Sequence, residues 1–234
     1  MQKNNAHSKL EVAGVWLFTI LPHHFLSRII YRLTRVRGPY VARAIRWFIK
    51  RYKVDMSEAQ IQDPELFATF NDFFTRELRP EARPITTSPG ILACPVDGTV
   101  SQCGRVYRNH LFQAKNHFYS VDDLLGGDQA LAKMFKTGSF ATIYLAPNNY
   151  HRIHMPMDGQ LKKMIHVPGR LFSVAPWTVR QVSCLFSRNE RVVCLFATAA
   201  GPVAMILVGA MNVSAIETDW HGQVVPPRGK KVSK

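Results

Sequence analysis

Two histidines and one aspartate are the residues of this sequence best suited to chemistry. The stretch YHRIHMP, Tyr150 to Pro156, places His151 and His154 three residues apart, directly after the strand-like segment FATIYLAP. Asp97 lies in CPVDGTVS, at a predicted tight turn between two apolar runs. Imidazoles and carboxylates can bind a metal, move a proton or support packing, so their surroundings must decide among these roles.

A metal site is the weakest of these interpretations. An HxxH pair binds zinc when a helix presents both rings on one face, whereas the flanking YLAP and MPMDG indicate a strand end and a loop. No third ligand stands at a suggestive spacing, and a zinc site takes at least three protein ligands. We therefore expect no metal at His151 and His154. A metal-dependent hydrolase that uses HxxH remains an alternative, which metal analysis would test.

Proton transfer suits these residues better. An aspartate can orient an imidazole, and the imidazole can activate a hydroxyl, as in Ser-His-Asp sites. The sequence has no G-x-S-x-G elbow to supply the serine. Residue types alone thus indicate an acid–base pair of Asp97 with a histidine and identify no nucleophile. An Asp-Gly turn and a histidine beside a strand are also common structural features, and that interpretation stays open.

The N-terminal quarter of the chain carries most of its net charge, which is +14 over 234 residues. Residues 1–53 contain eleven lysines and arginines and one acidic residue, Glu11. The apolar run Ala13 to Pro22 is shorter than the roughly 20 residues of a membrane span. After it, the sequence predicts two amphipathic helices, separated at Arg37 to Pro39. Their apolar faces are Leu26, Ile29, Ile30 and Leu33 in the first, and Val41, Ile45, Phe48, Ile49 and Tyr52 in the second.

These two helices suit the interface of an anionic membrane. Apolar side chains opposite arginines can enter the headgroup region, where each basic residue contributes about 1 kcal/mol. Packing on a soluble core would give the same periodicity, and nucleic-acid binding would give the same charge. Dense apolar segments such as VWLFTIL and RWFI favour lipid. The four cysteines lack CxxC spacing, so we expect reduced thiols, mostly in the core.

The remaining sequence predicts an α+β protein, with N-terminal amphipathic helices followed by a β-rich catalytic domain. A proline-rich connector, RPEARPITTSPG, is followed by short β-like runs that begin with ILAC at Ile91 and are separated by VDG, MDG and AAGP. We place a membrane-associating helical region at residues 1–60 and the β-rich domain at residues 61–234.

Seven sequence blocks occur in order between about Phe70 and Arg228: FNDFFTRELRPEARP, CPVDGTVSQCG, FQAKNHFYSVDDLLGG, YLAPNNYHRIHMPMDG, VPGRLFSV, NERVVCLF and ILVGAMNVSAIET. Together they resemble the bacterial phosphatidylserine decarboxylase proenzyme. The resemblance implies a lyase of phospholipid biosynthesis, which converts phosphatidylserine to phosphatidylethanolamine and carbon dioxide. In that family, a serine in a Leu-Gly-Ser-Thr motif cuts the chain and becomes a pyruvoyl group, the covalent cofactor pyruvate, on a small chain.

The resemblance also assigns roles by position. Asp97 and His154 match the family residues that act with the reactive serine in self-cleavage. His151 matches the first histidine of the same block, and we assign it to the protons of decarboxylation. The pyruvoyl group itself serves as the electron sink when carbon dioxide leaves.

The sequence departs from the family at its end, because it has no Leu-Gly-Ser-Thr motif and stops at PPRGKKVSK. Ser233 does not match the motif serine. We therefore expect a truncated or frameshifted proenzyme, or a partial record, that is inactive alone. The alternative is a membrane-surface binding module that keeps the fold without activity. Expected partners are phosphatidylserine, an anionic membrane surface and the small pyruvoyl-bearing chain, with no nucleic acid, at the cytoplasmic face of a bacterial cell membrane. A homo-oligomer is left open.

Overall fold

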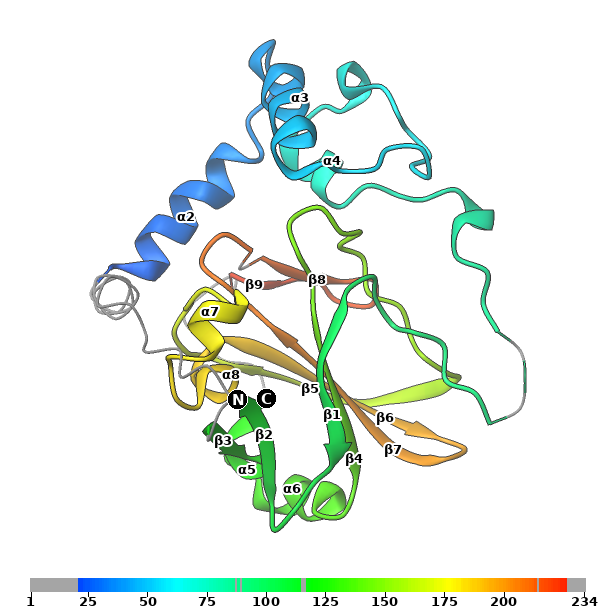
Figure 1. Cartoon of the computed structure of the whole chain (residues 1–234), viewed down its shortest axis with the longest axis vertical. Helices are drawn as coiled ribbons and strands as arrows, with labels where there is room; N and C mark the ends of the chain where they lie inside the picture. Colours follow the sequence, from blue (N-terminus) through cyan, green and yellow to red (C-terminus); the bar gives the residue numbers. More distant parts are fainter. Residues whose placement is uncertain (1–20, 87, 89, 115–116, 214, 227–234) are drawn as a thin grey trace, which may run out of the picture.

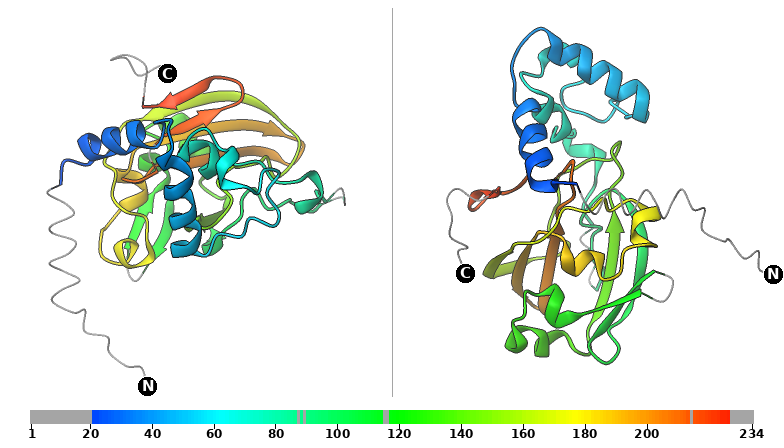
Figure 2. Two further views of the ribbon diagram at one scale, coloured as in Figure 1. Left: turned by 90° about the horizontal axis from the view of Figure 1, so that it is seen from above. Right: turned by 90° about the vertical axis from the view of Figure 1, so that its left-hand side faces the viewer.

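The computed structural model describes residues 21–86, 88, 90–114, 117–213 and 215–226. The predictions for Ala13 to Ile20 and for the sequence after Pro226 lie outside these residues. A helical N-terminal part lies at one end of the molecule, and the three-stranded sheet with the β1-β4 and β2-β3 pairs lies at the other, as Figure 1 and the right-hand view of Figure 2 show. The predicted α+β class is confirmed. The predicted boundary at residue 60 stays a prediction.

The helical part contains the two amphipathic helices that the periodicity predicts. They are α2, His23–Leu33, and α3, Tyr40–Tyr52. After them come the 3-10 turn η1, Pro64–Leu66, the short helix α4, Phe70–Phe74, and a second 3-10 turn, η2, Pro80–Ala82. Asp63 caps η1 through a hydrogen bond from the backbone of Glu65, and Thr69 forms a capping box with Asp72 at the start of α4.

The two helices use their apolar faces differently. On α3, Ile45 is fully buried, and together with Val41, Phe48 and Ile49 it packs against Val54, Phe67 and Phe73. The face predicted to enter lipid is therefore committed to a local core. On α2, the apolar residues diverge. Phe25, Ile29 and Leu33 are exposed at 61%, 38% and 64%, whereas Ile30 lines a pocket on the protein side.

A three-stranded antiparallel sheet, with strand order β5-β6-β7, forms the centre of the β-rich part. Alternate residues of β6 enter two cores: Val193 and Leu195 pack into one, and Val192, Cys194 and Phe196 into the other. This two-sided burial explains the continuous apolar run RVVCLFAT. The strands of this sheet are β5, Gly159–Val167, β6, Arg191–Thr198, and β7, Gly201–Val208.

Three antiparallel strand pairs and several short helices complete the fold. The pairs are β1-β4, β2-β3 and β8-β9. Their strands are β1, Thr99–Arg105, β2, His110–Ala114, β3, His117–Ser120, β4, Ser139–Tyr144, β8, Ile216–Thr218, and β9, Gly222–Val225. The helices are α5, Val121–Leu124, α6, Gln129–Phe135, α7, Pro176–Val179, and α8, Leu185–Arg188.

Two local predictions were wrong. The run ILAC, residues 91–94, forms no strand, because its backbone makes a single cross-link, from the Ala93 amide to the Pro156 carbonyl. The cysteines are free as expected, but Cys94 and Cys103 are exposed and only Cys194 is buried. A cysteine is small enough to sit on either side of a strand, so its burial follows the position it occupies.

Candidate active site

The two histidines lie on the irregular segment that joins β4 to β5, which agrees with the predicted strand end and loop. Backbone hydrogen bonds hold this segment beside the Asp97 turn: the His154 amide donates to Pro95 at 2.8 Å, and Ala93 donates to Pro156 at 2.9 Å. The side chain of Arg152 also donates to the Thr75 carbonyl at 2.8 Å. Residues far apart in the sequence are thus brought to one place, between the sheets and α4.

Asp97 is held in its ionised form by an arginine that sequence reasoning did not single out. Arg83 donates to both carboxylate oxygens, at 2.9 and 2.6 Å. These bonds are the main reason why the pKa of Asp97 lies below its usual range, with smaller contributions from Arg76 and His154. The same guanidinium donates to Glu58 at 3.0 and 2.9 Å, so it bridges two carboxylates. Arg83 comes from the proline-rich connector, where its sequence context is that of a solvated loop.

His154 lies within the electrostatic reach of Asp97, although no hydrogen bond joins the two side chains in the part of the chain described. Its Nε2 is 3.0 Å from the hydroxyl of Tyr150, and the two rings stack with centroids 5.6 Å apart. His154 is otherwise exposed. The structure therefore brings the predicted acid and base together electrostatically, with Tyr150 fixing the imidazole.

His151 lies in a different environment. Its ring packs on Phe74, with centroids 4.0 Å apart, and its Nε2 is 3.1 Å from the carbonyl oxygen of Ala146. Burial lowers the pKa of His151 to about 4, and the charge of Arg76 adds to this effect. The imidazole is therefore neutral at pH 7. A carbonyl oxygen can only accept, so Nε2 carries the proton and Nδ1 is left as the acceptor.

Arg76 is a buried cation beside all of these groups. Only 5% of the residue is exposed, and its Nε has no hydrogen-bond partner among the described residues. Its guanidinium carbon lies 5.5 Å from the Phe73 ring centre. Burial lowers the pKa of Arg76, which Asp97, Asp55 and Tyr150 counteract electrostatically. The sequence signal was an arginine inside the aromatic segment FNDFFTREL.

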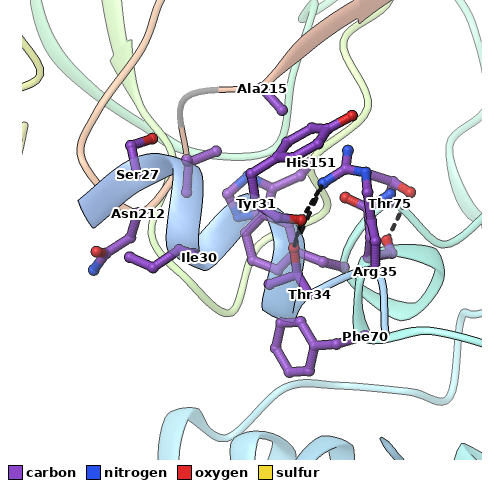
Figure 3. Close-up of a pocket in the computed structure, with 13 residues that line it drawn as sticks. Ser27, Ile30, Tyr31, Thr34, Arg35, Phe70, Thr75, His151, Asn212 and Ala215 are labelled. Atoms are coloured by element: carbon purple, nitrogen blue, oxygen red, sulfur yellow. Dashed lines mark hydrogen bonds between the residues drawn. The ribbon is translucent and has the colours of Figure 1, made fainter. Parts of the chain in front are cut away.

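A pocket opens beside His151 but does not reach His154 or Asp97 (Figure 3). Four segments line it: α2 and the residues after it, α4 and Thr75, the β4–β5 segment through His151, and the loop before β8. Although His151 and His154 are only three residues apart, their environments differ: His151 lines a pocket, whereas His154 lies near the ion pair of Asp97 with Arg83. Among the described residues, no group of three or more histidine, cysteine and acidic side chains is arranged to hold a metal.

Comparisons with known proteins agree with the resemblance that the sequence blocks indicated. The family model described as phosphatidylserine decarboxylase matches residues 70–234, and a second one, described as PSD, matches residues 14–53. Similar proteins include the phosphatidylserine decarboxylase proenzyme of Alkalilimnicola ehrlichii, which is 56% identical over 89% of this chain and 73% of that protein. The proenzyme of Bordetella pertussis is 54% identical over 88% of this chain and 70% of that protein. The proenzyme of Shewanella frigidimarina is 55% identical over 91% of this chain and 74% of that protein.

Proposed function

This chain belongs to the phosphatidylserine decarboxylase family, a family of carboxy-lyases, and from this premise we propose how its residues divide the work. Asp97 and His154 serve the self-cleavage of the proenzyme. His151 serves the decarboxylation of phosphatidylserine to phosphatidylethanolamine. The observation that carries this division is the difference between the two imidazoles: His151 is half-buried and neutral beside a pocket, whereas His154 is exposed and lies near an ionised carboxylate.

The setting of His154 suits a base for a hydroxyl. When an imidazole takes a proton from a serine hydroxyl it becomes a cation, and a nearby carboxylate stabilises that cation. Asp97 stays negative because Arg83 holds it ionised, so its charge is present when His154 becomes protonated. The contact with Tyr150 limits rotation of the imidazole. The hydroxyl itself belongs to a serine of the proenzyme.

The setting of His151 suits the handling of substrate protons. The amine of phosphatidylserine is protonated at pH 7 and must lose a proton before it can act as a nucleophile. With Nε2 bound to the Ala146 carbonyl, Nδ1 of His151 is left as the acceptor and can take that proton transiently. Because the pKa of His151 is lowered to about 4, the imidazolium holds the proton weakly and passes it to the substrate α-carbon after carbon dioxide has left, which restores the neutral ring.

The residues around the site fit a carbonyl-bearing cofactor. The unpartnered Nε of Arg76 is a donor that lacks an acceptor, and it lies within electrostatic reach of Asp97, Tyr150 and His151. A pyruvoyl group on a small chain cut from the same proenzyme would bring carbonyl acceptors to this donor. When bound, such a group supplies the electron sink for the loss of carbon dioxide.

We further propose that the chain binds peripherally to an anionic membrane, at the cytoplasmic face of the bacterial cell membrane. No helix in the described ranges is long and apolar enough to cross a bilayer. The exposed stripe of Phe25, Ile29 and Leu33 lies on α2 between arginines, and α3 exposes Trp47 at 62% among further basic residues. Apolar side chains framed by arginines can enter the headgroup region. A lipid substrate also has to be taken from such a surface.

Site-directed variants of a proenzyme that carries the reactive serine test the division of roles. Asp97→Ala and His154→Ala should leave one uncut chain on a gel. His151→Ala should still cut, but it should release little carbon dioxide from carboxyl-labelled phosphatidylserine. His110→Ala, at an exposed histidine of β2, serves as the control and should be normal in both assays. Normal cleavage by His154→Ala would refute its role as the base.

Sedimentation with vesicles tests the membrane proposal. Replacing Phe25, Ile29 and Leu33 together by serine should weaken binding to anionic vesicles severalfold, whereas high salt should weaken it without abolishing it. The control replaces two exposed apolar residues of the connector region, Ile85 and Leu92, by serine. If both variants bind as the unchanged chain does, α2 is not the attachment site.

A further inference from the structure

We propose that the pocket beside His151 is the binding site for the phosphate of the lipid headgroup, and that Arg35 is the residue that binds it. This inference rests on the proposed function, because the reacting headgroup is that of phosphatidylserine. The pocket is lined from α2 by Ser27, Ile30 and Tyr31, from the residues after α2 by Thr34 and Arg35, and from the β4–β5 segment by His151 (Figure 3).

The electrostatics of the pocket favour an anion. Arg35 is its one charged residue among the described lining residues, and none of these carries a carboxylate. His151 is neutral at pH 7 because burial lowers its pKa. The side-chain amides of Asn71 and Asn212 add neutral N–H donors for phosphate oxygens, whereas the hydroxyls of Tyr31, Thr34 and Thr75 donate to protein acceptors.

Arg35 is held in place but keeps donors available. Its guanidinium lies 3.8 Å above the ring centre of Tyr31. Nη1 makes only long hydrogen bonds, 3.3 Å to the Tyr31 carbonyl and 3.5 Å to the Thr34 hydroxyl. In the part of the chain that the structure describes, neither Nε nor Nη2 has a hydrogen-bond partner or an ion pair. A planar guanidinium with two adjacent free donors matches the spacing of phosphate oxygens.

Tertiary contacts fix this end of α2 over the pocket. The Tyr31 hydroxyl donates to the side chain of Gln223 in β9 at 2.7 Å, and the backbone N–H of Asn71, at the start of α4, donates to the Thr34 carbonyl at 2.8 Å. The wall that carries Arg35 is therefore attached to both the sheet and α4. A preorganised cation binds an anion with little loss of conformational entropy.

The shared pocket gives the phosphate contact a catalytic consequence. In phosphatidylserine, three bonds separate the phosphorus from the serine α-carbon. A phosphate bound by Arg35 therefore limits where the amine and the α-carbon can lie relative to Nδ1 of His151. We infer that Arg35 orients the headgroup, while His151 handles its protons. Arg32, about one turn earlier, is exposed on α2 and does not line the pocket.

Binding of water-soluble headgroup analogues to this chain tests the proposal without any need for catalytic activity. Glycerophospho-L-serine and inorganic phosphate are titrated separately at pH 7, and both heat and the NMR signal of the His151 ring are recorded. The unchanged chain should bind glycerophospho-L-serine, with a shift of the His151 signal. Arg35→Gln should weaken binding at least 10-fold, since charge-assisted bonds to the anion are lost. Arg32→Gln, the matched control on the same helix, should change it less than 2-fold.

A second variant guards against a folding defect in Arg35→Gln. Asn212 lies exposed on the loop that lines the pocket, so Asn212→Asp should fold normally and repel the phosphate, with a loss of similar size. Equal losses in Arg35→Gln and Arg32→Gln would mean unspecific attraction and would overturn the proposal. Equal affinity for inorganic phosphate would identify a free-phosphate site and overturn the assignment to the headgroup. If instead the proposed roles of His151 and His154 are wrong, the cleavage and carbon dioxide assays will show it, independently of these binding measurements.

Discussion

His151 should stay uncharged in the folded protein down to about pH 4. Burial against the rest of the site lowers its pKa from 6.5 to about 4, and the positive charge of Arg76 acts in the same direction, while the bond to the Ala146 carbonyl opposes both. In the unfolded chain, the same imidazole titrates near 6.5. Acid should therefore destabilise the fold through this one residue.

The sign and size follow from proton binding. Between pH 6.5 and about pH 4, the unfolded chain carries a proton on His151 that the folded chain lacks, so the free energy of unfolding falls as the pH drops through this window. One pKa unit is worth about 1.4 kcal/mol, so the full loss is roughly 3 kcal/mol. The loss is complete below about pH 4 and absent well above pH 6.5.

Comparison with His151→Gln isolates this contribution, because glutamine keeps an N–H donor and does not titrate. Urea unfolding is measured at pH 7 and pH 4.5 for both proteins. The unchanged chain should lose about 2 to 3 kcal/mol more than the variant, since all other titrating groups are shared. An NMR titration of the His151 ring gives the midpoint directly. Equal pH dependence of the two proteins, or a midpoint near 6.5, would refute the reasoning.

Three further predictions concern the surroundings of the site. Gly169→Ala should lower the free energy of unfolding by about 1 to 3 kcal/mol in urea, because the added Cβ would meet the backbone of Arg188. Asn189→Ala should lower the free energy of unfolding by about 2 to 4 kcal/mol in the same assay, because this fully buried side-chain amide is hydrogen-bonded to the backbones of Phe172 and Gly209. An unchanged urea midpoint would contradict that role. Arg83→Gln should raise the pKa of Asp97 toward 3.8, so that on acidification the variant loses the stabilisation by ionised Asp97 at a higher pH than the unchanged chain does. Carbon NMR of the Asp97 carboxyl would detect the shift, and an unchanged pKa would argue against the role of Arg83.

The sequence by itself determined the elements whose signals are local. A 3.6-residue period located α2 and α3, and turn signals between apolar runs located β5, β6 and β7. The order of the seven blocks identified the family, which the comparisons confirm. The strand end and loop around YHRIHMP were also predicted, because a proline and an Asp-Gly turn limit the backbone there.

Only the tertiary structure decided how these elements use their side chains. Periodicity showed that α3 has an apolar face, but the aromatic cluster of Phe67 and Phe73 determines that this face is buried in protein. Likewise, the spacing of His151 and His154 could not show that one ring packs on α4 and the other lies near an ion pair. A pattern records neighbours along the chain, whereas burial, ion pairing and pKa depend on partners that folding brings from distant positions.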